Sequence, residues 1–166
     1  VQESISLSAL GREKNDASLN FPIDVVSRWI SREQDLSLSS ILIVGVAFKG
    51  EPATSDIRMS PSVEVLKRLT CQYPSVSFQY FDFEYTQPSL SSVGLNEVTR
   101  FDIESGDETN QFDAVLILNN HRRNASIKYH ILRERGLIFD GYRQIKNLID
   151  LNSITYATIG QILFAD

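Results

Sequence analysis

The chain has 166 residues, 42% of them hydrophobic, so it can bury one sizeable core and is too short for two full domains. A formal net charge of -5 argues against nucleic acid and anionic membranes as partners, since both require a basic surface. No membrane-spanning run or signal peptide is visible, which predicts a cytoplasmic protein. One cysteine and two histidines exclude a disulfide framework and do not form a metal-ligand cluster.

Two stretches have the spacing of amphipathic helices. In the first, which starts near Pro22, apolar side chains recur three and four positions apart: Ile23, Val26, Trp29 and Ile30. A polar, serine-rich linker is expected to follow over residues 35–40. The second helix is expected to begin at Ser60-Pro61 and to end before Pro74, with an inward face made of Val63, Leu66 and Leu69.

Apolar runs between these helices and beyond them predict strands. The clearest covers residues 41–47, and others are expected at 76–82, 98–102, 113–118, 136–140 and 154–159. Residues 83–97 are expected to form a surface loop, and residues 124–133 a third helix. Because strands and helices alternate, we predict a Rossmann-like α/β domain of three layers, with a mostly parallel sheet flanked by helices.

Ligands of such sheets bind in the loops that follow the carboxyl ends of the strands. The first loop reads Gly-Val-Ala-Phe-Lys-Gly over residues 45–50, which matches neither the GxGxxG fingerprint of dinucleotide sites nor the phosphate loop GxxxxGK[ST]. Its Lys49 could neutralise a diphosphate, and its Phe48 could cover a base or ribose. The alternative is that Phe48 belongs to the core and Lys49 is merely solvated.

Two stretches, 44–49 and 55–61, resemble the signature of the UDP-glucose/GDP-mannose dehydrogenase family, C-terminal domain, which reads G-x-A-F-K and then D-x-R-x-S-P. Further segments of that domain follow in the expected order at 80–82, 113–121, 139–141 and 156–160. Upstream, residues 11–16 with Pro22 resemble the end of the family's central helical domain. The resemblance implies that residues 1–36 belong to the central, dimerisation domain and its linker, and residues 37–166 to the nucleotide-sugar-binding domain.

The family oxidises C6 of a nucleotide-linked sugar to a carboxylate with two NAD, in enzymes of polysaccharide biosynthesis. The resemblance implies that Phe48 and Lys49 contact the UDP part of a UDP-sugar, and that Arg58 reaches NAD held mainly by the N-terminal domain. The family's nucleophilic cysteine lies in the central domain, so we expect no catalytic residue in this chain and no activity from it alone. The intact enzyme is expected to be a homodimer.

The chain departs from the family pattern at one candidate ligand contact. The family's Asp-Gly-Arg motif corresponds to Asp140-Gly141, which is followed here by Tyr142 and then Arg143. Arg143 either replaces the family arginine as a contact to the UDP part or points away from it, because neighbouring side chains on an extended segment face opposite sides. The spacing from Lys49 to Arg58 is also longer than in many members.

The remaining polar candidates are weaker. Cys71 is expected to be a packed, inert thiol, and Asp82 to fix a loop. The segment 121–123, His-Arg-Arg, is expected to be a solvated loop, with phosphate contact as the alternative. Two other functions stay open: a stand-alone, non-catalytic module that binds a nucleotide sugar or mediates assembly, and an ordinary dinucleotide-binding domain, which the missing glycine fingerprint disfavours.

Overall fold

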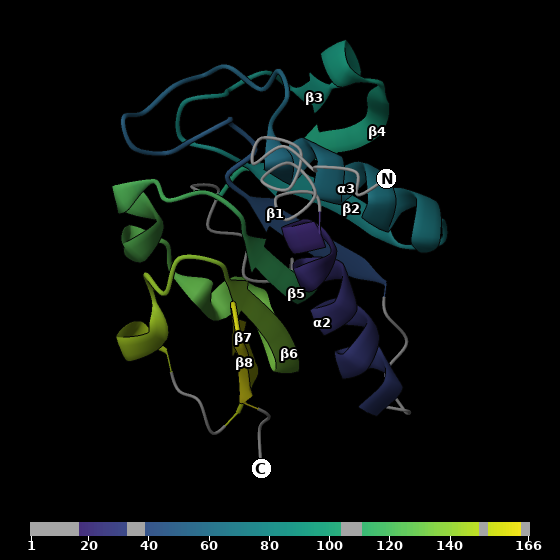
Figure 1. Ribbon diagram of the computed structural model, residues 1–166, viewed down its shortest axis with the longest axis vertical. Coiled ribbons are helices and arrows are strands. Elements are labelled where there is room, and N and C mark those ends of the chain that lie inside the picture. Colours follow the sequence, from purple (N-terminus) through teal and green to yellow (C-terminus); the bar gives the residue numbers. More distant parts are fainter. Residues whose placement is uncertain (1–16, 33–38, 104–110, 150–152, 164–166) are drawn as a thin grey trace, which may run out of the picture.

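An eight-stranded sheet runs through the protein (Figure 1). The structure is a computed structural model, which describes residues 17–32, 39–103, 111–149 and 153–163. The spatial order of the strands is β3-β4-β2-β1-β5-β6-β7-β8. Their bounds are β1 Ser40–Val44, β2 Ser77–Phe81, β3 Ser89–Leu90, β4 Leu95–Arg100, β5 Phe112–Ile117, β6 Leu132–Asp140, β7 Thr155–Thr158 and β8 Gln161–Leu163.

The six central strands are parallel, and β3 and β8 pair antiparallel with β4 and β7 at the two edges. Strand β1 pairs with β2 on one side and β5 on the other, so the direction in which the chain adds strands reverses at β1. In doubly wound sheets this reversal opens a crevice at the carboxyl ends of the two central strands. The predicted Rossmann-like α/β fold is thus confirmed. The loops after β1 and β5 lie at the reversal point, where ligands of such sheets bind.

The two α-helices of the described residues lie on one face of the sheet. Helix α2 (Asn20–Arg32) and helix α3 (Pro61–Gln72) share one buried cluster with alternate residues of the central strands, such as Ile41 and Ile43. Trp29 of α2 is only 2% exposed, and α2 also contacts α3 and β6 (Figure 1). The predicted boundary between residues 36 and 37 lies outside the described residues.

The opposite face is covered by 3-10 turns and loops. Three such turns are described: η2 (Arg122–Ser126), η3 (Tyr129–Ile131) and η4 (Lys146–Leu148). The predicted helix over 124–133 is therefore wrong, although Ile127 and Ile131 are buried. Side chains there bond to nearby backbone and compete with helical bonding: the Ser126 hydroxyl donates to the carbonyl of Arg123, and the Tyr129 hydroxyl to that of Asn124.

Residues 83–97 also differ from the predicted surface loop. They contain β3, the 3-10 turn η1 (Ser91–Val93) and the start of β4, and Leu90 is fully buried. Strand β8 was not expected either, because its three residues show no extended apolar pattern. Neither of the described α-helices has the length and apolar character that crossing a bilayer requires.

Candidate functional site

The loops that follow β1 and β5 are bound to each other at the reversal point of the sheet. The side-chain oxygen Oδ1 of Asn120 accepts hydrogen bonds from the backbone N–H groups of Gly50 (3.0 Å) and Glu51 (3.1 Å). A Cβ atom on Gly50 would overlap the backbone of His121, so the close approach of the two loops requires glycine there. This contact holds the loop that carries Phe48 and Lys49 in one position.

Closer to the sheet, Asn119 packs against Gly45. Gly45 has φ of 88°, and a Cβ atom on it would overlap the side-chain amide of Asn119. In dinucleotide-binding folds, the glycine directly after the first strand serves the tight turn. Here the close contact with Asn119 likewise requires a residue without a side chain at the start of the loop.

Asp82, at the carboxyl end of β2, fixes the first loop from its other side. It is 2% exposed. Its Oδ2 accepts the N–H of Ala47 at 3.0 Å, and its Oδ1 accepts the N–H groups of Glu84 (2.8 Å) and Tyr85 (3.0 Å). The loop-fixing role predicted for Asp82 is confirmed, and its oxygens are engaged with backbone rather than held ready for a ribose.

Phe48 and Lys49 come directly after Ala47, and both are exposed. Phe48 is 50% exposed and is therefore not a core residue. Its N–H donates to the carbonyl oxygen of Asp56 at 2.8 Å, which closes the long loop upon itself. A fixed backbone thus presents an aromatic ring and an ammonium group at the edge where ligands of such folds bind. Their contact with a nucleotide stays a prediction.

Arg58 lies in the same loop and is bound to Asp56. Its Nε and Nη2 atoms donate to Oδ1 and Oδ2 of Asp56 at 2.9 and 2.8 Å, a two-point contact between a guanidinium and a carboxylate. These hydrogen bonds lower the pKa of Asp56 to about 2. The Arg58 side chain is 85% exposed, so it is accessible, but a cofactor phosphate would have to compete with Asp56 for it.

The loop after β6 is shaped by the buried carboxylate of Asp140. Oδ2 of Asp140 accepts from the N–H of Ile145 (2.9 Å) and the hydroxyl of Tyr156 (3.0 Å), while Oδ1 accepts from the N–H of Tyr142 (3.2 Å). Arg143 has a left-handed backbone, with φ of 56°, and its Nη2 donates to the carbonyl of Ile159 at 3.3 Å.

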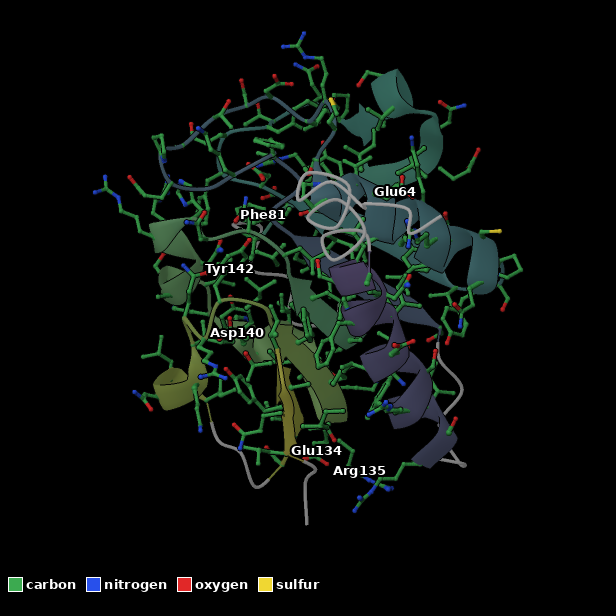
Figure 2. The ribbon with its side chains drawn as sticks, viewed as in Figure 1. Glu64, Phe81, Glu134, Arg135, Asp140 and Tyr142 are labelled. Atoms are coloured by element: carbon green, nitrogen blue, oxygen red, sulfur yellow. The ribbon has the colours of Figure 1, made fainter. Side chains whose placement is uncertain are left out.

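Tyr142 and Arg143 therefore differ in where they lie. Tyr142, labelled with Asp140 in Figure 2, is 53% exposed and lines a cavity at this edge. Arg143 is instead tied to the turn after β7. The proposed contact of Arg143 with the nucleotide stays a prediction, and the structure gives that residue another partner.

Two other residues lie in surroundings that the sequence did not indicate. His121 is 6% exposed: its ring stacks on Phe83, its Nδ1 accepts from the N–H of Arg123, and its Nε2 lies 3.3 Å from a carboxylate oxygen of Glu84. The prediction of a solvated loop is thus wrong for His121, although Arg123 is exposed. Cys71 is exposed rather than packed, near the carboxyl end of α3.

The site residues that sequence reasoning missed are Asn119, Asn120 and Tyr142. The signal for the two asparagines was their position directly after the buried strand β5, where ligand and loop contacts concentrate. Tyr142 was visible as a departure from a motif, but its relation to the cavity depends on how α3 and the ends of β5 and β6 are arranged around it.

The comparisons with known proteins agree with this picture. The model of the UDP-glucose/GDP-mannose dehydrogenase family, UDP binding domain, matches residues 42–147. Among solved structures, the chain is similar to the UDP-N-acetyl-mannosamine dehydrogenase Cap5O from S. aureus, with a TM-score of 0.65 and 22% sequence identity. The match covers 90% of this chain and 32% of that chain. No curated protein shows significant sequence similarity.

Proposed function

Because the chain belongs to the UDP-glucose/GDP-mannose dehydrogenase family, as the match to its UDP-binding domain over residues 42–147 shows, we propose that it binds the nucleotide part of a UDP-sugar for an NAD-dependent 6-dehydrogenase. The observation that carries this proposal is the fixed loop after β1, which exposes Phe48 and Lys49 at the reversal point of the sheet. A lysine there can neutralise a diphosphate, and a phenyl ring can cover the ribose or base.

The fixation of this loop supports a binding role. Asp82 holds the backbone just before Phe48, and Asn120 holds it just after Lys49. A loop that is already ordered loses less conformational entropy when a ligand binds, so more of the contact energy contributes to affinity. A merely solvated lysine would not need two side chains to hold its neighbours in place.

We assign the chemical step to parts of the enzyme outside this chain, which spans 32% of the solved dehydrogenase that it resembles. NAD is the hydride acceptor in such enzymes, and the loop after β1 lacks the GxGxxG fingerprint of an NAD site. In this proposal, NAD is held mainly by an N-terminal domain and Arg58 reaches it from this domain. The partners are the N-terminal and central domains of the same enzyme, as a cytoplasmic homodimer of polysaccharide biosynthesis.

One observation favours the second function, a stand-alone binding or assembly module without a catalytic parent. Arg143, the candidate replacement for the family's sugar-nucleotide contact, bonds to the carbonyl of Ile159. If Arg143 does not contact the sugar nucleotide, the domain could still hold a nucleotide through Lys49 without orienting the sugar for oxidation.

Calorimetry of the chain with UDP, GDP and NAD tests the proposed function. We expect UDP to bind, and Lys49→Ala to weaken it about tenfold or more, since hydrogen bonds to charged groups contribute about 1.5–3 kcal/mol. The control is Lys128→Ala, which removes an exposed lysine before η3 and should leave UDP binding unchanged. Binding of NAD alone, or UDP binding that does not depend on Lys49, would contradict the proposal.

A further inference from the structure

The side chain of Gln144 joins the loop after β6 to the loop after β5. Gln144 lies in the turn that the buried carboxylate of Asp140 shapes. That carboxylate accepts the N–H of Tyr142 at 3.2 Å and the N–H of Ile145 at 2.9 Å, so it bonds the backbone on both sides of Gln144. The base of the Gln144 side chain is therefore held in place by the end of β6.

Both polar atoms of the Gln144 amide are engaged with the loop after β5. Its Nε2 donates to the backbone carbonyl of His121 at 3.0 Å, and its Oε1 accepts from Nδ2 of Asn124 at 3.1 Å. A backbone carbonyl can only accept, so the amino group of Gln144 must face His121 and its oxygen must face Asn124. Asn124 is 1% exposed and also donates to the carbonyl of Asn119 at 3.0 Å. The amide thus bridges two points of a buried network.

His121 in turn lies against the loop that carries Lys49. A Cβ atom on Gly50, the residue after Lys49, would overlap the backbone nitrogen of His121. Gln144 bonds the carbonyl of His121, and Gly50 packs against its amide nitrogen. The same backbone unit therefore contacts both the loop after β6 and the residue next to Lys49.

The side chain of His121 restrains this unit further. The residue is 6% exposed, its ring stacks on Phe83, and its Nε2 lies 3.3 Å from a carboxylate oxygen of Glu84. Close-packed groups of this kind transmit a displacement rather than absorb it. Chains of packed side chains and hydrogen bonds carry energetic coupling between residues that do not touch each other. The contacts from Gln144 through His121 to Gly50 form such a chain.

We propose that Gln144 is a positioning residue for Lys49, which holds the loops after β1, β5 and β6 in one arrangement without touching the ligand itself. This inference rests on the proposed function, because Lys49 is the proposed contact to the diphosphate. It adds the loop after β6 to the two clamps on the Lys49 loop, Asp82 and Asn120. A lysine held by all of these contacts loses less conformational entropy on binding.

Calorimetry of the full chain with UDP and inorganic pyrophosphate tests the positioning role. Gln144→Met keeps the length of the side chain but has no amide, and it should weaken both ligands about fivefold, as expected for coupling through a network. The matched control is Gln72→Met. It removes an amide that donates to the hydroxyl of Ser27 at 3.1 Å near the carboxyl end of α3, and it should leave both affinities unchanged.

A double-mutant cycle separates positioning from general loosening of the fold. In the Lys49→Ala chain, Gln144→Met should cause no further loss of UDP affinity, because Gln144 acts only through Lys49. Hydrogen exchange supplies a readout without ligand: the amides of Gly50 and Glu51 should exchange faster in Gln144→Met than in the parent chain or in Gln72→Met. Gln144→Ala, a second variant, should give the same results if the methionine variant does not fold.

The outcomes distinguish this inference from the proposed function. If the Gln144 variants keep both affinities, weaken UDP but not pyrophosphate, or leave the exchange of Gly50 unchanged, the positioning role is wrong. A further fivefold loss in the Lys49→Ala chain also overturns it. In each of these cases, UDP binding that depends on Lys49 still supports the proposed function. UDP binding that does not depend on Lys49, or no UDP binding at all, overturns both.

Discussion

The side-chain amide of Asn119 occupies the space that a Cβ atom on Gly45 would need. Gly45 also has φ of 88°, a left-handed conformation that favours glycine. The turn after β1 can therefore close against the loop after β5 because residue 45 has no side chain.

Gly45→Ala is expected to destabilise the protein through both effects. Strained backbone and overpacking each cost about 1–3 kcal/mol, so we expect a loss of about 3 kcal/mol in the free energy of urea unfolding. Gly94→Ala is the control, because Gly94 has φ of 82° but nothing within 4 Å of an added Cβ. It should cost about 1 kcal/mol from backbone strain alone. Equal losses at both positions would show that Asn119 does not restrict residue 45.

Asn120→Ala should loosen the loop that carries Phe48 and Lys49. The substitution removes the acceptor shared by the N–H groups of Gly50 and Glu51, so both amides should exchange with solvent faster. The free energy of unfolding should fall by about 1 kcal/mol. Hydrogen exchange followed by NMR measures the effect residue by residue, with Asn96→Ala on the exposed part of β4 as control. Unchanged protection of both amides would contradict the proposed clamp.

The carboxylate of Asp56 should titrate far below its ordinary pKa of 3.8, at about 2, because Arg58 donates to both of its oxygens. Since the folded pKa is the lower one, the stabilisation is present above pH 3.8 and is lost as the pH falls through 2. Exposure of both side chains makes the effect on stability small and sensitive to salt. NMR titration of the Asp56 carboxyl carbon measures the shift, and Arg58→Ala should return it toward 3.8.

At alkaline pH, buried tyrosines should destabilise the fold. Burial raises the pKa of Tyr80 from 10.0 to about 12 and also raises that of Tyr156, which lies beside Asp140. Because the folded pKa is the higher one, stability is complete below pH 10 and is lost as the pH rises from 10 to 12.

Tyr80→Phe tests this dependence. It removes the hydrogen bond to the carbonyl of Gln87, so stability at neutral pH should fall by about 1 kcal/mol. The decline between pH 10 and 12, measured by urea unfolding, should nevertheless become shallower than in the parent chain. Tyr142→Phe, at an exposed position, is the control and should keep the parent profile. An identical alkaline slope in the Tyr80 variant would rule out this tyrosine as a source.

Sequence patterns predicted burial better than they predicted the type of element. Val63, Leu66 and Leu69 are buried, as their spacing predicted. Over 124–133, by contrast, side chains such as Ser126 bond to the backbone and the chain forms 3-10 turns in place of the predicted helix. The spacing of apolar residues reports which side of a segment faces the core. It does not report how side chains such as Asn119 compete for the backbone, since that depends on a strand distant in the sequence.

The candidate site shows the same division. The motif around Phe48 and Lys49 was recognisable because it is a continuous stretch of chain, and the structure leaves both residues exposed at the expected edge. The position of Tyr142 against the cavity was not predictable, because it depends on how α3 packs beside the ends of β5 and β6. The left-handed backbone of Arg143 had no sequence signal either, since arginine rarely adopts it.

The sequence alone determined the parallel α/β architecture and predicted the loop that we propose binds a diphosphate. Both follow from local runs of residues: buried apolar strands, and a lysine shortly after one of them. The tertiary structure decided which side chains fix that loop, that Asn119 fills the glycine turn, and that Tyr142 rather than Arg143 lines a cavity. These facts depend on pairs of residues far apart in the chain, and distance in sequence carries no information about contact until the sheet order is known.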